Sequence, residues 1–279
     1  MINVLITGCS TGIGACAAEK LHLRGYNVIA TVRKTEDSLA LQKMDITTTL
    51  LDLTDSDSIQ QAVAFTLKHF NNQLDALFNN AAFGQPGAVE DLSRDTLRQQ
   101  FETNVFGTQE LTNQVIKHMR TQGYGRIIYN SSVLGFVSMA YRGAYNASKY
   151  ALEGLADTLR QELHHSGIFI SLIEPGPILS RFRANAFLKY QQHIDKNTSP
   201  HRDVYAAMEQ RLRKPGPAAP FTLGPEAVVN KLVHAIESKR PKIRYYVTFP
   251  TYLFAVLKRI LPHRCLDWIL FKVSQDEHK

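Results

Sequence analysis

Cysteine, tryptophan and long apolar runs are all scarce in this chain of 279 residues. The three cysteines, Cys9, Cys16 and Cys265, are odd in number, far apart and without metal-ligand spacing, so the sequence indicates neither a disulfide framework nor a zinc site. The longest apolar stretches, near residues 252–257, are too short to cross a bilayer. No secretory signal is expected, because a strand-like apolar pattern begins at Ile2 without a basic region ahead of it. These absences favour a protein of the reducing cytoplasm with no bound metal.

Positive charge is in excess. The chain has 32 lysine and arginine residues against 25 carboxylates, a formal net charge of +7. This balance predicts an anionic partner, and a phosphorylated cofactor, a membrane surface or a nucleic acid would each fit. Because the basic residues are scattered, without a helix-turn-helix or zinc-finger pattern, no nucleic-acid partner is expected.

Short apolar runs alternate with longer amphipathic segments through most of the chain. The alternation predicts strands at residues 2–7, 27–32, 49–52, 74–79, 126–130, 168–173 and 243–247. It predicts helices at residues 14–24, 56–70, 144–165 and 225–238, and residues 93–121 carry apolar side chains at helical spacing. Repeated units of this kind predict the α/β class: a doubly wound parallel sheet in a single, three-layer α/β/α, Rossmann-like domain over residues 1–249.

Two segments depart from this alternation. Residues 181–220 are mixed helical and polar with a Pro/Gly-rich end, which fits either a helical substrate lid or an ordinary pair of packed helices. Residues 250–279 form a basic, amphipathic C-terminal extension that includes Trp268. We expect this extension to pack on its own domain or on another subunit, with peripheral contact to a membrane surface as the alternative.

The first predicted strand runs into a glycine-rich turn, Thr7-Gly8-Cys9-Ser10-Thr11-Gly12-Ile13-Gly14. Glycines let the backbone turn tightly and let a pyrophosphate approach the amides at a helix N-terminus. Between a strand and a helix, this turn predicts nucleotide binding, although glycine also serves sharp corners that bind nothing.

The second strand ends in Arg33 and Lys34 and not in a carboxylate. A carboxylate at this place would bind the ribose hydroxyls and repel a 2′-phosphate, whereas the planar fork of an arginine grips one. The sequence therefore favours NADP(H), with NAD(H) as the second option and a solvated basic turn as the alternative reading. Asp52, after the third strand, is expected either to accept from the adenine amino group or to cap a loop.

Tyr145 and Lys149 lie one turn apart on the same face of a predicted helix. A nearby ammonium favours the phenolate and is expected to lower the tyrosine pKa from its usual value of about 10. Upstream, the fifth strand ends in Asn130-Ser131-Ser132, where a hydroxyl is available to a substrate oxygen. The pattern predicts acid/base chemistry, although a packed tyrosine beside a surface lysine has the same spacing.

Taken together, these residues resemble the short-chain dehydrogenase/reductase family over roughly residues 1–250. Five motifs of the family are matched, by Thr7, Gly8, Gly12 and Gly14, by Asn79-Asn80-Ala81-Ala82, by Asn104 in Asn104-Val105-Phe106-Gly107, by Tyr145 with Lys149, and by Pro175-Gly176. Ala82 replaces a glycine of the family pattern, and Ser180 stands where the family often has threonine. The catalytic serine of the family precedes the tyrosine by 13 positions, which selects Ser132 over Ser131.

The resemblance also implies the roles of these residues. Ser132 would polarise the substrate oxygen, Tyr145 would transfer the proton, and Lys149 would hold the nicotinamide ribose. Asn104 would support a water chain to Lys149, and the hydride chemistry would belong to the cofactor. The implied cofactor contacts are Gly8, Ser10, Thr11, Gly12, Ile13, Gly14, Arg33, Asp52, Leu53, Asn80, Ala81, Tyr145, Lys149, Pro175, Gly176, Ile178 and Ser180.

The expected substrate is a small apolar alcohol or carbonyl compound. Within the family, the turn and the second strand resemble most the NADP-preferring branch of steroid and retinol dehydrogenases. Apolar residues also lie near the expected pocket in sequence, although each is equally compatible with core packing: Phe83, Val133, Leu134, Phe136, Met139 and Tyr141. The resemblance further implies a homodimer or homotetramer. A non-catalytic nucleotide-binding or scaffold protein of the same fold is the alternative, against which the complete catalytic set argues.

Overall fold

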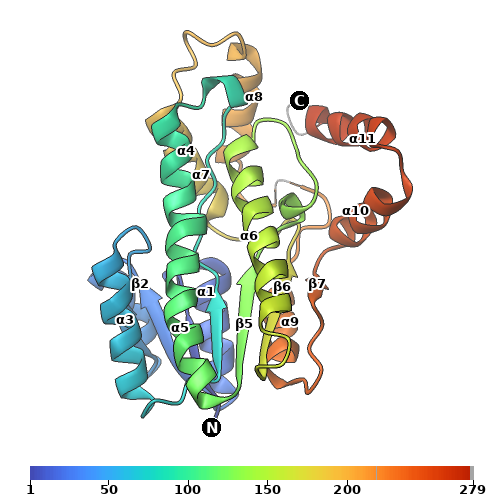
Figure 1. The fold of residues 1–279 in the computed structure, drawn as a ribbon. Helices are drawn as coiled ribbons and strands as arrows, with labels where there is room; N and C mark the ends of the chain where they lie inside the picture. The colour runs from blue at the N-terminus through green and yellow to red at the C-terminus, as the bar shows by residue number, and fades with distance from the viewer. Residues whose placement is uncertain (218, 277–279) are drawn as a thin grey trace.

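The computed structural model describes residues 1–217 and 219–276; Ala218 of the predicted lid and residues 277–279 of the predicted extension lie outside this description. The described residues form one seven-stranded parallel sheet in the order β3-β2-β1-β4-β5-β6-β7, which confirms the predicted fold class (Figure 1). The strands are β1 (Asn3–Ile6), β2 (Asn27–Val32), β3 (Thr47–Leu50), β4 (Ala76–Asn79), β5 (Gly125–Asn130), β6 (Ile168–Glu174) and β7 (Arg244–Tyr246).

The chain enters the sheet in its middle and reverses direction there. In β1, Val4 pairs with Val28 of β2 on one side and with Ala76 of β4 on the other. The chain first runs outward to β3 and then returns to β4, so the connections after β1 and β4 leave in opposite directions. Such a reversal opens a crevice at the carboxyl ends of the strands, where ligands of doubly wound sheets bind.

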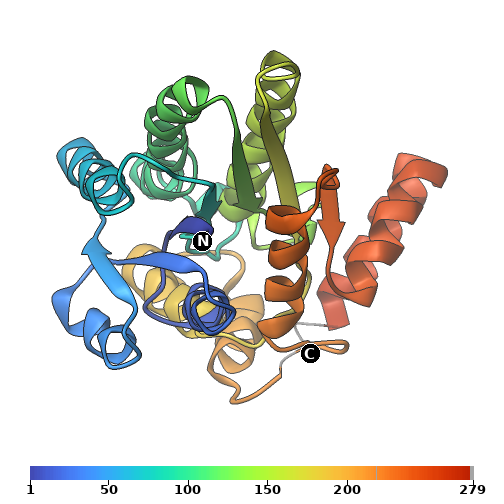
Figure 2. The ribbon, with the colours of Figure 1, turned by 90° about the horizontal axis from the view of Figure 1, so that it is seen from below.

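Helices cover both faces of the sheet (Figure 2). On one face, α1 (Gly12–Leu23) and α9 (Glu226–Glu237) bury Leu21 and Leu232 against the strands. On the other, α3 (Ser56–His69), α5 (Thr108–Gln122) and α6 (Gly143–Glu162) bury Ile59, Leu111 and Leu152. Because helices cover both faces, the central strands β1 and β4 are buried on both sides and show no strict alternation, whereas the edge strand β3 is only partly buried.

Several boundaries differ from the sequence prediction. Helix α1 begins at Gly12, two residues early, and β3 ends at Leu50, two residues early. The predicted helix over residues 93–121 consists of α4 (Arg94–Phe101), a π-helical turn η3 (Glu102–Gly107) and α5. The short helices were not predicted, because three or four residues carry no periodicity: η1 (Thr35–Ser38), α2 (Leu39–Gln42), η2 (Val89–Asp91) and η4 (Val133–Gly135).

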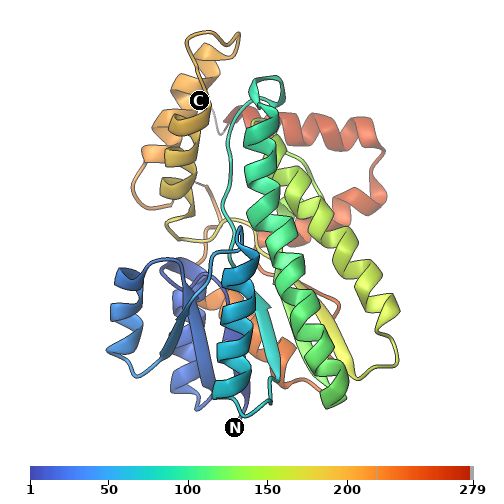
Figure 3. The same ribbon diagram turned by 60° about the vertical axis from the view of Figure 1, so that its left-hand side comes forward.

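Residues 181–220 contain two helices, α7 (Phe182–His193) and α8 (Arg202–Arg213), which stand over the carboxyl ends of the strands (Figures 1 and 3). Tyr190 and Tyr205 are almost fully buried between them and pack with Ala144 at the start of α6. The hydroxyl of Tyr205 also accepts a hydrogen bond of 2.9 Å from the backbone amide of Ala88. The segment therefore roofs the crevice with a small core of its own.

The C-terminal extension forms α10 (Phe249–Ile260) and α11 (His263–Asp276) beside β7 (Figure 1). Phe254 and Leu270 pack against Val137. The extension therefore covers its own domain, which is one of the placements that the sequence predicted. The outer side carries apolar residues as well: Val256 is 56% exposed and Trp268 is 63% exposed. Among the described residues, no helix combines the length and the apolar character that a membrane span requires.

Candidate active site

The turn after β1 points backbone amides at the crevice. Gly8 has a φ of +71°, a left-handed conformation that favours glycine, and a Cβ on Gly14 would lie 2.2 Å from the carbonyl oxygen of Gly8. Thr11 caps α1 without a side-chain hydrogen bond, and the first turn of the helix contains no acidic residue. These amides are therefore left for an anion, which the helix dipole also favours.

A chain of hydrogen bonds connects this turn to Lys149. The hydroxyl oxygen of Thr7 accepts from the backbone amides of Asn80 and Ala81, both at 2.9 Å. The amide group of Asn130 donates to Oδ1 of Asn80 at 2.9 Å, and Nζ of Lys149 donates to the carbonyl oxygen of Asn130 at 2.7 Å. The ammonium group is thus positioned by the residues that hold the glycine-rich turn.

Three predicted cofactor residues lie where β2 and β3 end. Arg33, Asp52 and Leu53 line the same cavity as the glycine-rich turn, and Arg33 is exposed. Oδ1 of Asp52 accepts hydrogen bonds from the backbone amide and the hydroxyl of Thr54, at 2.9 and 2.8 Å. Asp52 therefore caps a loop, one of its two predicted roles.

Helix α6 and the end of β5 bring the predicted catalytic residues together. Nζ of Lys149 lies 5.6 Å from the centre of the Tyr145 ring, and the hydroxyl of Ser132 lies within hydrogen-bonding reach of the Tyr145 hydroxyl. Ser131 instead lies beside Gly135 and Glu153. A Cβ added to Gly135 would lie 2.7 Å from Oγ of Ser131 and 3.1 Å from Oε1 of Glu153. Of the two serines, Ser132 is the one placed beside the tyrosine.

The protonation of the pair differs from the sequence-based expectation. Burial raises the pKa of Tyr145 to about 12, and the hydrogen bond from Ser132 opposes this rise only in part. Burial also lowers the pKa of Lys149 to about 8, while Glu153 opposes that change. The expected lowering of the Tyr145 pKa is therefore wrong for this structure, because desolvation of the phenolate raises the pKa by more than the hydrogen bond from Ser132 lowers it.

Asn104 lies in the π-helical turn η3 and is fully buried. Its Oδ1 accepts from the backbone amide of Phe83 at 3.1 Å, and its Nδ2 donates to the carbonyl oxygen of Phe83 at 3.0 Å. Nδ2 also lies 3.1 Å from Oγ of Ser148, the residue before Lys149. Asn104 thus connects α6 to the loop after β4, in which Ala82 needs no left-handed conformation.

The segment after β6 closes the other side of the crevice. The predicted residues Pro175, Gly176, Ile178 and Ser180 all line the cavity. The carbonyl oxygen of Pro175 accepts from the amide of Val133 at 2.8 Å, which ties this segment to the loop that carries Ser132. A Cβ on Gly12 would lie 3.1 Å from Cβ of Ser180, so Ser180 lies directly against the glycine-rich turn.

The cavity has a volume of about 840 Å³ and continues from the glycine-rich turn to the space below α7 and α8. Five of the six predicted apolar residues line it: Phe83, Val133, Leu134, Met139 and Tyr141. The sixth, Phe136, takes the alternative role of core packing: it packs with the C-terminal helices, and its ring centre lies 6.0 Å from that of Tyr246. Phe182 of α7, which the sequence did not single out, places its ring 5.2 Å from that of Tyr145.

A buried charge cluster behind Lys149 was also missed. Arg244 lies 2.9 Å from Glu174, 3.0 Å from Glu153 and 2.8 Å from Asp157. The sequence held one signal, because Tyr145, Lys149, Glu153 and Asp157 recur every fourth residue along α6 and so share one face. That Arg244 lies beside this face could not be predicted from local sequence, because it depends on β7 lying next to β6 in the sheet.

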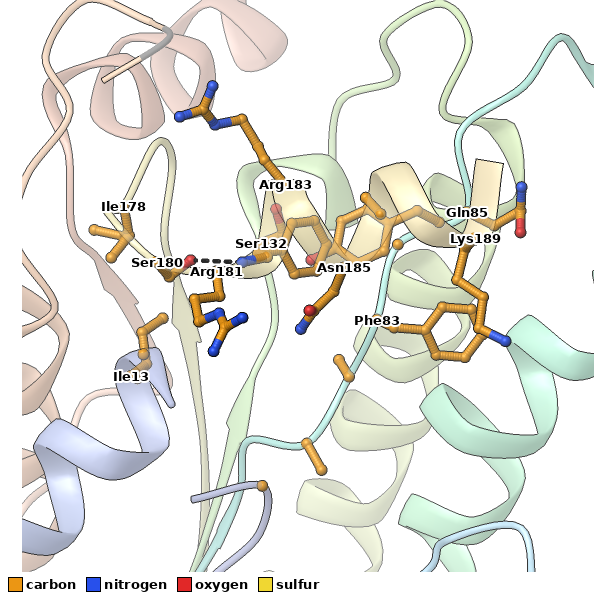
Figure 4. Close-up of a pocket in the computed structure, with 18 of the residues that line it drawn as sticks. Ile13, Phe83, Gln85, Ser132, Ile178, Ser180, Arg181, Arg183, Asn185 and Lys189 are labelled. Atoms are coloured by element: carbon orange, nitrogen blue, oxygen red, sulfur yellow. Dashed lines mark hydrogen bonds between the residues drawn. The ribbon is translucent and has the colours of Figure 1, made fainter. Parts of the chain in front are cut away.

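The residues present fit a dinucleotide. The glycine-rich turn offers uncapped helix amides, Arg33 adds a cation at the end of β2, and Lys149 lies beside Tyr145 at the other end. Figure 4 shows Ile13, in the first turn of α1, and Ser180, after β6, among the residues that line this space. Bound NAD(P) would be held by the turn, by Arg33 and by Lys149, and would supply the hydride chemistry.

Comparison with known proteins identifies the family of this chain. Residues 3–191 match the family described as short chain dehydrogenase. An uncharacterized oxidoreductase of Escherichia coli (strain K12), YbbO, is 46% identical over 96% of this chain and 93% of its own length. An NADPH-dependent 3-dehydrocapnine reductase of Ornithobacterium rhinotracheale is 31% identical, covering 98% of this chain and 97% of its own.

Human retinol dehydrogenase 8 is 33% identical, covering 87% of this chain and 80% of its own. The crystal structure of a short-chain dehydrogenase from Streptomyces avermitilis superposes with a TM-score of 0.76 at 27% identity, over 99% and 98% of the two chains. The chain therefore belongs to the short-chain dehydrogenase family, the NAD(P)-dependent oxidoreductases that act on CH–OH groups.

Proposed function

We propose that this protein is an NADP(H)-dependent oxidoreductase that interconverts an apolar primary or secondary alcohol and its aldehyde or ketone, of the steroid, retinoid or lipid-carbonyl type. The observation that carries the proposal is the single cavity that Tyr145, Ser132 and Lys149 share with the glycine-rich turn and Arg33. Arg33 is an exposed cation where a carboxylate would select NAD(H), which supports NADP(H). The name of the similar NADPH-dependent reductase supports the same choice.

In the reduction direction, the hydroxyl of Ser132 donates a hydrogen bond to the substrate carbonyl oxygen, and Tyr145 gives that oxygen its proton. The nicotinamide, when bound, supplies the hydride. Because burial raises the pKa of Tyr145 to about 12, its hydroxyl is protonated at neutral pH and suits the donor role. The Lys149 ammonium stabilises the phenolate that remains, and oxidation reverses the same steps. In this proposal Asn104 supports a water chain to Lys149 through its place beside Ser148.

The walls of the cavity favour an apolar substrate. Phe182 packs edge-on to Tyr145 and against Gly84, where a Cβ would lie 2.7 Å from its ring. Leu134, Met139 and Met208 extend the apolar lining toward α8. The similar retinol dehydrogenase bears the name of an apolar alcohol, which agrees with this reading.

We further propose a division of roles along the chain. Residues 1–249 form the catalytic domain, and within it residues 181–220 act as a lid over the substrate. The extension, residues 250–279, presents the outer side of α10 and α11 to a second copy of the chain, since members of the family generally form oligomers. Peripheral contact of a cytoplasmic protein with a membrane surface is the competing use of this side.

Tyr145→Phe tests the proposal, because it removes only the hydroxyl that transfers the proton. We expect turnover of aldehydes and ketones with NADPH to fall by about 10²-fold or more, the loss typical of a removed acid/base group. Binding of NADPH, followed by nicotinamide fluorescence, should stay within about twofold of wild type. Substantial residual turnover would contradict the role of Tyr145, and a folded wild type that binds neither NADPH nor NADH would favour the non-catalytic reading.

A further inference from the structure

We infer that Arg181, at the start of the lid, binds the diphosphate of the dinucleotide in addition to the amides of the glycine-rich turn. The inference rests on the proposed cofactor site. Arg181 directly precedes α7 and lines the cavity. Figure 4 shows its side chain extending below Ser180 toward Ile13 in the first turn of α1.

The neighbours of Arg181 hold its backbone at this place. Ser180, one position earlier, lies against Gly12, since a Cβ there would be 3.1 Å from Cβ of Ser180. Phe182, one position later, lies 5.2 Å from the ring of Tyr145, measured between ring centres. Oγ of Ser180 also accepts from the amide of Phe182 at 3.3 Å. Arg181 is therefore fixed between the cofactor turn and the catalytic tyrosine.

The charge of Arg181 lacks a carboxylate partner among the residues that line the cavity. Within the described residues, Asp52 and Glu102 are the carboxylates of this lining, and Asp52 already accepts two hydrogen bonds from Thr54. Arg183, two positions later, has a different role, because it donates to the carbonyl oxygens of Arg211, at 3.0 Å, and of Gly216. Arg183 ties α7 to the end of α8, whereas Arg181 faces the crevice.

The segment around Arg181 also has more positive than negative side chains. Residues 181–220 contain eight lysine and arginine residues but three carboxylates, so most of the net charge of the chain lies here. A bound anion at the crevice would offset this charge. The N-terminus of α1, with its uncapped amides, is the place for a diphosphate, and a planar guanidinium fork binds phosphate oxygens in pairs.

This contact would couple the cofactor to the lid. Since Arg181 begins α7, a diphosphate held between it and α1 would fix the lid against the cofactor domain. Arg33, at the end of β2, would read the 2′-phosphate and have no effect on α7. The two arginines therefore make separable predictions for NADPH, which carries the 2′-phosphate, and for NADH, which does not.

The experiment is a fluorescence titration of four proteins with NADPH and with NADH. We expect Arg181→Ala to weaken both nucleotides by about tenfold or more, the loss typical of a charge-assisted hydrogen bond. Arg33→Ala should weaken NADPH selectively. Arg202→Ala removes an exposed lid cation that does not line the cavity, and should change neither affinity by more than about twofold.

An unchanged affinity in Arg181→Ala, or a loss confined to NADPH, would overturn the assignment to the diphosphate. Arg181→Gln, with a thermal melt of each variant, checks that the loss does not come from unfolding.

Hydrogen exchange gives a second readout. Saturating NADPH should slow exchange in α7 of the wild type and not of Arg181→Ala, and equal protection in both would refute the coupling. If the wild type binds neither nucleotide, the proposed function fails as well; if it binds and Arg181→Ala binds equally, only this inference fails.

Discussion

Glu153 and Glu174 are buried carboxylates that share one guanidinium, 7% and 0% exposed. Arg244 lies 3.0 and 2.9 Å from them and also 2.8 Å from Asp157. The pKa of Glu174 is raised to about 8. Burial is the largest cause, and the neighbouring charge of Glu153 raises the pKa by more than Arg244 lowers it. We therefore expect Glu174 to hold a proton near neutral pH in the folded protein, next to Glu153 on the face of α6 that also carries Lys149.

This proton makes stability depend on pH. A carboxyl whose pKa is raised by folding stabilises the protein fully below its usual value near 4.5, and the contribution is lost as the pH rises through about 8. We expect the free energy of unfolding of the wild type to fall by on the order of 1–3 kcal/mol between pH 5.5 and 8.5, at about 1.4 kcal/mol per unit of pKa difference. Urea unfolding at several pH values measures this slope.

Glu174→Gln carries no charge at any of these pH values and should flatten the slope, leaving the contributions of other groups whose pKa values folding shifts, among them Glu153, Lys149 and His193. Glu36→Gln, at an exposed position, is the matched control and should keep the wild-type slope. A variant as steep as the wild type would show that Glu174 is ionised throughout the range, with Arg244 as a sufficient partner.

At the scale of elements, local patterns predicted what depends on local sequence. The spacing of Tyr145 and Lys149 predicted their common face on α6, and the end of β5 predicted a hydroxyl at the site, whereas the choice of Ser132 over Ser131 came from the family resemblance. The edge strand β3 was misplaced by two residues, because its threonines are only half buried and show no clear apolar run. The π-helical turn was not predicted from the helical spacing of residues 93–121, and neither was the hydrogen bond by which Asn104 in this turn contacts the backbone of Phe83, 21 positions away in sequence.

The packing of α1 on its turn gives a prediction for a pair of glycines. Gly14→Ala places a Cβ 2.2 Å from the carbonyl oxygen of Gly8 and 2.6 Å from Nδ2 of Asn80, neither of which yields easily. We expect a loss of about 1–3 kcal/mol in the free energy of unfolding, as for other overpacked sites, and weaker binding of NADPH. Denaturant unfolding and nicotinamide fluorescence measure the two effects.

Gly154→Ala is the control on α6, where an added Cβ meets nothing within 4 Å. Alanine is the better helix former by about 1 kcal/mol, so this variant should be as stable as the wild type or more stable. If both variants behave alike, close packing at Gly14 does not limit this turn.

For the whole molecule, strand–helix alternation predicted the sheet and the edge at which the site lies, but not how the last third of the chain packs. The sequence left Phe136 equally compatible with the pocket and with core packing, and the structure shows it packed with the C-terminal helices. The apolar residues of those helices divide between an inner side, with Phe254 and Leu270, and an outer side, with Val256 and Trp268. Periodicity shows that a helix is amphipathic; it does not show which surface covers a second apolar side.

If the outer side meets a second copy, charges placed there should separate the subunits. We expect the wild type to be a dimer or tetramer and the double variant Val256→Glu, Trp268→Glu to have a smaller mass by light scattering. Binding of NADPH should persist, because neither residue lines the cavity. Leu23→Glu, at a position that is 71% exposed on α1, is the matched control and should leave the mass unchanged.

A mass that stays the same in the double variant, together with lost flotation on vesicles containing anionic lipid, would assign this side to a membrane surface. The basic residues of the two helices, among them Arg259 and Arg264, would then face the lipid headgroups. No change in mass or in flotation would contradict both uses. In that case the exposed side has no partner, and the oligomer that the family leads us to expect must form through another surface of the sheet domain.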